Sequence, residues 1–264
     1  MNAIRLDASD LAIAACLVAL SALVSLLLRL RMERQIVWAA ARTVAQLLLV
    51  GHLLRLVFIH DTPWITAALV ALMMALAARE VAARPQARLR GHGNAWVGAL
   101  TVGTATVVTA LFILHTALRP DPWYDPRYVI SLVGIVLGSV LNAASLALDG
   151  MLSGVRRDKA GIEARLALGA TAYEAFSPLL RASVRRGIVP TINQMSAAGI
   201  ITLPGIMTGQ IIAGMDPVEA VKYQILIMFL LAGASAMAAI GTAYAAMRRL
   251  TDGRARLRLD RLSG

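Results

Sequence analysis

Long, uninterrupted stretches of apolar residues dominate this chain. A membrane-crossing helix needs about 20 consecutive residues that are mostly apolar. Six segments reach or approach that length: Leu11–Leu28, Ile36–Ile59, Ala95–Leu118, Tyr128–Leu148, Met195–Met215 and Tyr223–Met247. A seventh, Trp64–Ala78, is shorter. The pattern predicts an all-α, polytopic membrane helical bundle with about seven transmembrane helices, forming a single domain over residues 1–264.

Composition supports this class. The chain is 58% hydrophobic and 16% charged, with a mean hydropathy of +0.69, which excludes an ordinary soluble domain of this length. Aromatic residues are only 5% of the sequence, and Ala and Leu dominate, so helices are favoured over a membrane β-barrel. A single cysteine, Cys16, excludes internal disulfides.

The net charge of +11 is placed beside the apolar spans. Segments 29–35, 79–94, 149–190 and 248–264 hold 20 of the 26 Lys and Arg residues. Positive residues accumulate in cytoplasmic loops, so we expect an external N-terminus, a cytoplasmic loop 149–190 and a basic cytoplasmic tail 248–264. This placement indicates a lipid bilayer as the partner of the positive charge, and no nucleic acid.

The loop 149–190 contains an amphipathic pattern. Apolar residues recur at helical spacing, which predicts one continuous helix with a single apolar stripe: Ile162, Leu166, Gly169, Tyr173 and Phe176. Glu163 lies off the stripe, and Pro178 is expected to end this helix and start another. Such a helix either lies on lipid or docks into a groove on a soluble partner.

The predicted span Met195–Met215 contains Pro204 followed by Gly205, which predicts a kink or a short unwound stretch. Freed carbonyls there, with Thr208 and Gln210, would offer oxygen ligands to a cation. The alternative is packing, because Gly205 and Gly209 form a GxxxG pair. The candidate residues for a translocation path or hinge are Asn142, Asn193, Met195, Pro204, Gly205, Met207, Thr208, Gly209 and Gln210.

Asn142 and Asn193 leave alternatives open. Asn142, inside the predicted span Tyr128–Leu148, is costly in lipid unless it is paired, so it either joins two helices or contacts substrate. Asn193 stands where the inner loop re-enters the membrane, where it either caps a helix or lines the cytoplasmic mouth.

Four segments together resemble the FetB-type permease family: RTVAQLLLVGHLLRLVF (42–58), IEARLALGAT (162–171), RRGIVPTINQM (185–195) and GIITLPGIMTGQIIAGMDPVEAVKYQILIMF (199–229). That family comprises permeases of a bacterial ABC iron exporter and includes plant relatives linked to aluminium tolerance. The resemblance implies a homodimeric permease in the bacterial inner membrane, paired with a separate cytoplasmic FetA-type ATPase. It implies ATP-driven export of a metal ion, iron, and a role in metal homeostasis and resistance to metal-driven oxidative stress.

For individual residues, the resemblance implies that the loop helix couples to the ATPase through Ile162, Glu163, Leu166, Gly169 and Tyr173. The sequence has no glycine-rich phosphate-binding motif, so ATP and Mg²⁺ are expected on the partner subunit, with no cofactor and no catalytic residue in this chain. No metal ligand is assigned. The alternative function, an ion-gradient-driven secondary metal transporter, is disfavoured because the seven spans contain no Asp or Glu. An intramembrane enzyme is disfavoured because no HExxH or paired intramembrane Asp is present.

Overall fold

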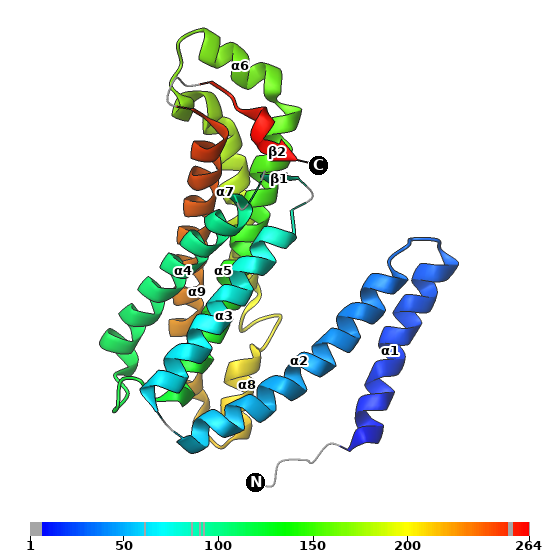
Figure 1. The fold of residues 1–264 in the computed structure, drawn as a ribbon. Coiled ribbons are helices and arrows are strands. Elements are labelled where there is room, and N and C mark those ends of the chain that lie inside the picture. The colour runs from blue at the N-terminus through cyan, green and yellow to red at the C-terminus, as the bar shows by residue number, and fades with distance from the viewer. Residues whose placement is uncertain are drawn as a thin grey trace. The chain divides into compact units, whose positions relative to one another are not determined.

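The computed structural model describes residues 7–60, 62–85, 87–89, 91, 93–252 and 256–263, and within these ranges the chain is almost entirely helical (Figure 1). It divides into two compact units. The first is Met1–Thr62 with Ile212–Gly214, and the second is Pro63–Ile211 with Met215–Gly264.

The first unit is a helical hairpin of α1 (Ala8–Leu27) and α2 (Glu33–His60). Its tight turn places Arg29 and Arg31 in the left-handed region, at φ of 54° and 58°. The Ser25 hydroxyl closes the turn by accepting from the Met32 amide at 3.1 Å and donating to the Glu33 carboxylate at 3.4 Å. A side-chain hydroxyl thus satisfies an amide that would otherwise lack a partner before α2 begins.

The second unit is a bundle around α5. In chain order its elements are α3 (Pro63–Ala83), β1 (Arg88–Leu89), α4 (Gly93–Ile113), the π-helix η1 (Leu114–Leu118), α5 (Pro126–Arg157), α6 (Lys159–Ala167), α7 (Ala172–Ala197), α8 (Gly205–Ile212), α9 (Pro217–Leu250), η2 (Leu259–Arg261) and β2 (Leu262–Ser263). The central helix α5 packs against α3, α4, α7 and α9. Both α5 and α9 begin at an Asp-Pro pair, in which the side chain of Asp125 or Asp216 accepts from free backbone amides of the first turn. The proline occupies the first helical position, where a backbone N–H would have no partner within the helix.

Small residues allow close helix packing at places other than those predicted. A Cβ on Gly187 of α7 would lie 2.7 Å from the Ala143 carbonyl oxygen of α5 and 2.8 Å from Ala239 Cβ of α9. Gly187 therefore marks a three-helix contact. At Gly205 and Gly209, the alternative packing pair, no atom of the described residues lies within 4 Å of a Cβ built on either glycine, so packing within this chain does not use them.

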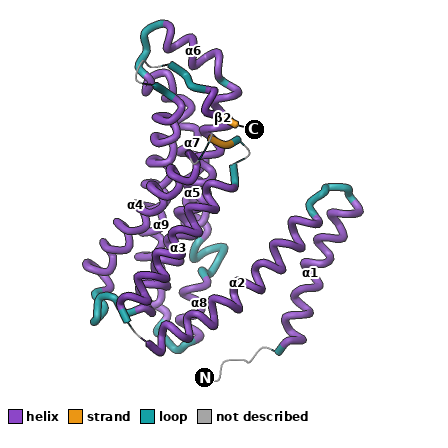
Figure 2. The backbone as a smooth tube through the Cα atoms, viewed as in Figure 1, coloured by secondary structure: helices purple, strands orange, loops and turns teal. Residues whose placement is uncertain are grey.

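Six helices in the described part of the chain are long and apolar enough to cross a membrane, and they correspond to six of the seven predicted spans. The short Trp64–Ala78 segment belongs to the 21-residue α3. The exception is Met195–Met215, which is not one helix. It consists of the end of α7, a non-helical stretch and the eight-residue α8 (Figure 2). Within the second unit, α6 and α8 lie at opposite ends of the bundle (Figure 1), so α7 and α8 together carry the chain between those ends. The orientation in the membrane stays a prediction.

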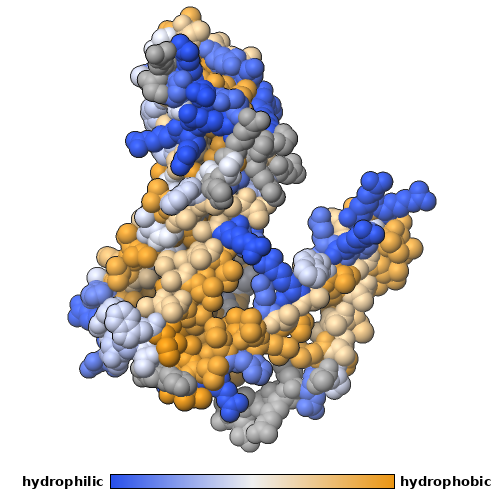
Figure 3. All heavy atoms as spheres, viewed as in Figure 1, coloured by the Kyte–Doolittle hydropathy of each residue, from blue (hydrophilic) through white to orange (hydrophobic). Residues whose placement is uncertain are grey.

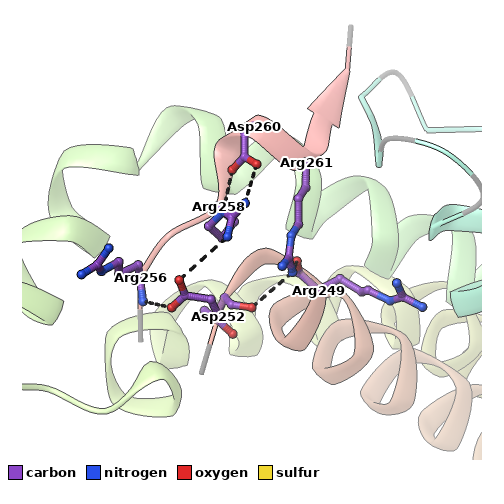
Figure 4. Close-up of polar contacts among 7 residues, drawn as sticks. Arg249, Asp252, Arg256, Arg258, Asp260 and Arg261 are labelled. Carbon is purple, nitrogen blue, oxygen red and sulfur yellow. Dashed lines mark hydrogen bonds and ion pairs between the residues drawn. The ribbon is translucent and has the colours of Figure 1, made fainter. Parts of the chain in front are cut away.

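The described part of the C-terminal tail is folded. β2 pairs with β1, and Leu257, Leu259 and Leu262 pack against the core. Arg258 makes two 2.8 Å hydrogen bonds to Asp260 and lies 4.0 Å from Asp252 (Figure 4), and the ion pair lowers the pKa of Asp260 from 3.8 to about 2. In Figure 3, hydrophilic side chains gather at this end of the second unit, whereas apolar side chains cover much of the bundle's length.

Candidate functional site

The helices α6 and α7 form a hairpin at one end of the second unit, where one continuous helix from Ile162 to Phe176 was expected. That expectation is wrong. α6 ends at Ala167, Gly169 adopts a φ of +90°, and α7 begins at Ala172. A φ in this region strains any residue with a Cβ, so the glycine that interrupts the apolar stripe is the residue that turns the chain.

The turn satisfies its own backbone groups. The Ala170 amide donates to the Arg165 carbonyl and the Gly169 amide donates to the Leu166 carbonyl, both at 3.1 Å, which is the Schellman arrangement. The Thr171 amide and hydroxyl then donate to the Glu174 carboxylate, each at 2.8 Å, and the Glu174 amide returns a bond to the Thr171 hydroxyl. These bonds from Thr171 lower the pKa of Glu174 below 4.5. The hairpin therefore has a defined shape.

The stripe residues divide between the two sides of the hairpin. Ile162 and Phe176 are completely buried and Leu166 is half-buried against the core. The Arg165 guanidinium donates to the Ala175 carbonyl at 3.0 Å and braces α6 against α7. This inward side anchors the hairpin to the bundle.

The outward side carries different residues. Glu163 is exposed and lies 3.9 Å from Lys159. Tyr173 is half exposed and stacks on Tyr244 of α9, with 6.0 Å between ring centroids. Leu168, at the tip, is 88% exposed. Sequence reasoning missed Leu168 because it lies outside the apolar stripe; the signal was its place directly before the turn glycine.

The helix α7 runs through Pro178 and Pro190. The expectation that Pro178 starts a new helix is therefore wrong. A proline inside a helix costs about 3 kcal/mol. Both prolines are exposed, while Leu179, Ser183 and other residues on the opposite side stay buried against the bundle, so packing along α7 outweighs that cost.

The helical path is interrupted between α7 and α8, as the Pro204–Gly205 pair predicted. Gly199 has a φ of +85°, its amide donates to the Thr202 carbonyl at 2.8 Å, and the Ile201 and Thr202 amides share the Ala197 carbonyl at 3.0 Å. Pro204 stands directly before α8, where its missing N–H costs nothing. Its carbonyl accepts from both the amide and the hydroxyl of Thr208, at 3.0 and 3.1 Å.

No residue of α8 is buried, in contrast to the other α-helices of the second unit. Met207, Thr208 and Gln210 are half-buried, whereas Gly205 and Gly209 are exposed. The Gln210 side-chain oxygen is the one side-chain polar atom of α8 that is shielded from water without a hydrogen-bond partner among the described residues. An amide oxygen in this position can accept from a donor or coordinate a cation.

The other candidates are placed separately. The Asn142 side chain accepts from Arg84 at 2.8 Å, and Arg84 lies 3.8 Å from Glu80, so Asn142 joins α5 to the end of α3. Between the two alternatives for Asn142, this contact favours the link between helices. Asn193 is exposed and Met195 half-buried, both in the last turns of α7 just before the break.

Sequence reasoning missed a polar stripe on the buried side of α9. Gln224, Ser235 and Thr242 are spaced by three and two helical turns, so they share one side of the helix. Thr242 bonds to Thr101 of α4 at 2.9 Å, and Thr191 of α7 donates to Ser235 at 3.2 Å. Their regular spacing within an apolar helix was the available signal. These bonds hold α4, α7 and α9 together inside the bundle.

Within the described ranges, no three His, Cys, Asp or Glu side chains gather where they could hold a metal ion. A cavity of about 430 Å³ between α3, α4 and α5 is lined almost wholly by apolar side chains, including Trp64, Val70 and Trp123. Its hydroxyl groups belong to Thr66, Thr106 and Tyr124 alone, and with no charged group beside them such a lining is poorly suited to an ion. The features suited to transport are therefore the two ends of α7: the hairpin before it and the break after it.

Comparison with known proteins gives the family. The model described as "Uncharacterised protein family (UPF0014)" matches residues 8–251. A UPF0014 membrane protein of Synechocystis is 38% identical over 205 residues, covering 76% of this chain and 77% of its own. The "Probable iron export permease protein FetB" of Escherichia coli is 31% identical over 265 residues, covering 99% of both chains. The rice UPF0014 membrane protein STAR2 is 31% identical over 231 residues, covering 88% of this chain and 79% of its own.

No solved structure matches this chain. The chain belongs to the UPF0014 membrane protein family, which includes the FetB and STAR2 proteins, and the resemblance drawn from the sequence motifs is confirmed. It is a multi-pass membrane protein of a permease family.

Proposed function

We propose that this member of the UPF0014 family is the permease subunit of an ABC transporter that exports iron from the cytoplasm across the bacterial inner membrane. ATP would be hydrolysed by a separate FetA-type subunit, and two copies of the permease would form the pathway. One observation carries the proposal: the chain matches the probable iron export permease FetB over 99% of both lengths. Export would relieve iron excess and the oxidative stress that follows.

The hairpin supports the coupling part of this proposal. A helix that docks into a groove presents exposed apolar residues on a rigid support. Leu168 projects at the tip, while the buried Ile162 fixes the hairpin to the bundle and the Arg165–Ala175 bond holds α6 against α7. Ile162 and Leu166 therefore act by anchoring the hairpin, and the ATPase would contact Leu168 and Glu163.

The route of the motion follows from the continuity of α7. Displacement of the hairpin would move α7 as one helix, past the Thr191–Ser235 bond and into the break that begins at Ala198. Irregular backbone at membrane depth persists only where protein or water satisfies it. The break, with Thr208 and Gln210 beside it, would then meet the pathway, and a second copy would complete its walls.

The test is the metal content of whole cells after an iron load, measured by mass spectrometry across the first-row transition metals. Cells that lack this chain are compared with cells that overproduce it together with its ATPase and with cells that overproduce it alone. We expect iron to rise in the first and fall in the second. A change in another metal with iron unchanged would discard iron as the cargo, and a fall without the ATPase would favour the gradient-driven alternative.

A further inference from the structure

A groove of about 420 Å³ runs along α7 beside α9, below the hairpin. Near the start of α7 it is lined by Tyr173, Ser177, Leu180 and Arg181 with Tyr244 of α9, then by Val184 and Arg185, and further along α7 by Ile188 and Ile192. An adjoining hollow of about 410 Å³ shares Tyr244 and adds Arg248 and Arg249 of α9. The groove is therefore cationic and aromatic at one end and apolar at the other.

The four arginines differ from Arg258 of the folded tail. Arg258 is paired with Asp260 and Asp252. By contrast, all four of these arginines are exposed. In the described part of the chain no carboxylate lies within ion-pair distance of Arg181, Arg185, Arg248 or Arg249. Several positive charges at one end of a groove favour an anionic ligand that carries strong acceptor oxygens.

The apolar end determines what kind of anion fits. Seven residues separate Arg185 from Ile192, which is about 10 Å along a helix. Ile192 is 51% exposed, and α9 beside it is a candidate membrane span. A free phosphate would leave this apolar surface uncovered, whereas a phospholipid would place its headgroup at the arginines and an acyl chain along Ile188 and Ile192.

We propose that this groove binds an anionic phospholipid. Basic pockets between membrane helices are suited to such headgroups, and a tyrosine ring is at home at the level where headgroup and acyl chain meet. The second helix of the hairpin, α7, begins at Ala172, so Tyr173 lies in its first turn, where it stacks on Tyr244. The bound lipid would therefore lie directly beneath the hairpin. The site does not depend on which substrate the protein moves.

Native mass spectrometry of the purified full chain tests the proposal. The protein in neutral detergent is given equal amounts of phosphatidylglycerol and phosphatidylcholine with the same acyl chains. We expect phosphatidylglycerol to be retained preferentially. Each arginine near an anionic headgroup strengthens binding about fivefold, so the double variant R181Q/R185Q should lose roughly 25-fold in phosphatidylglycerol affinity.

Two controls make the result specific. R156Q/R157Q removes the same charge from an exposed pair outside the groove and should keep the preference. Ile192→Asn should weaken both lipids equally and leave their ratio unchanged. Equal retention of the two lipids by the unaltered protein, or an equal loss in R156Q/R157Q, would overturn the proposal. So would a shift from dimer to monomer in R181Q/R185Q with lipid retention intact, because the groove would then bind a second copy.

Discussion

The two ends of α7 show how similar chain breaks can have opposite mechanical character. Before the helix, Gly169 turns the chain at a φ of +90°; after it, Gly199 does so at +85°. The first break is held by the buried Ile162 and Phe176 and by a complete set of capping bonds. The second is closed by backbone bonds and leads into α8, which has no buried residue; each break carries an exposed apolar residue, Leu168 at the first and Ile200 at the second.

This difference indicates a division of labour. An anchored turn transmits force, because displacing it would expose buried apolar surface and break its bonds. A turn without buried anchors rearranges at little cost and belongs to the low-stability part of a molecule. If the protein is an ATP-driven permease, the rigid end suits coupling and the loosely held end suits gating.

The largest expected effect comes from removing an anchor. Ile162→Ala should lower the free energy of unfolding by about 3 kcal/mol, because it leaves a cavity beneath the hairpin. Ile200→Ala, the matched change at the other end, should stay within about 0.5 kcal/mol of the unaltered protein. Unfolding titrations in mixed detergent and SDS micelles measure both. Equal losses would contradict the contrast between the two ends.

The next effect concerns docking. Leu168→Asp should weaken binding of the ATPase subunit about 30-fold, the range of an interface hot spot, and leave the unfolding free energy within about 0.5 kcal/mol because the side chain is exposed. Leu203→Asp, at the other break, should leave ATPase binding unchanged. Affinity measured by biolayer interferometry with the permease in nanodiscs distinguishes them. Unchanged affinity in Leu168→Asp would remove the hairpin tip from the interface.

A smaller effect should follow from the turn glycines themselves. Gly169→Ala forces a Cβ into the left-handed region and should cost about 1 kcal/mol of unfolding free energy. Gly199→Ala carries the same local strain but should change global unfolding less, since its segment can open on its own. Hydrogen exchange read by mass spectrometry should show faster exchange confined to 198–212 in the second variant. A larger loss of global stability in Gly199→Ala would reverse the assignment of rigid and loose ends.

The smallest effect is a pH dependence at the rigid end. The pKa of Glu174 is lowered in the folded protein, so its bonds to Thr171 stabilise fully above pH 4.5 and are lost as the pH falls through the lowered pKa. The melting temperature of the unaltered protein should therefore exceed that of Glu174→Gln at neutral pH, and the two should converge in acid. A difference that grows below pH 4.5 would contradict the capping role.

Much of the fold followed from local pattern. Six spans were predictable because a long apolar run has few alternatives to a membrane helix, and the Pro204–Gly205 pair indicated where helical bonding fails. The prediction of one continuous helix from Ile162 to Phe176 was wrong because residues at helical spacing can belong to two helices that a glycine separates. The prediction that Pro178 starts a new helix was wrong because the free-energy cost of a proline inside α7 is offset by the residues that the rest of α7 buries.

The sequence by itself determined the membrane class, the position of the spans and the family, since each depends on composition or on a run of neighbouring residues. Only the tertiary structure decided which side of the hairpin is exposed, that Gly187 lies at the contact of α5, α7 and α9, and that Thr191 bonds Ser235. It also brought Arg181, Arg185 and Tyr244 to one groove. These are relations between helices far apart in the chain, and no periodicity within a single helix encodes which neighbour it will meet.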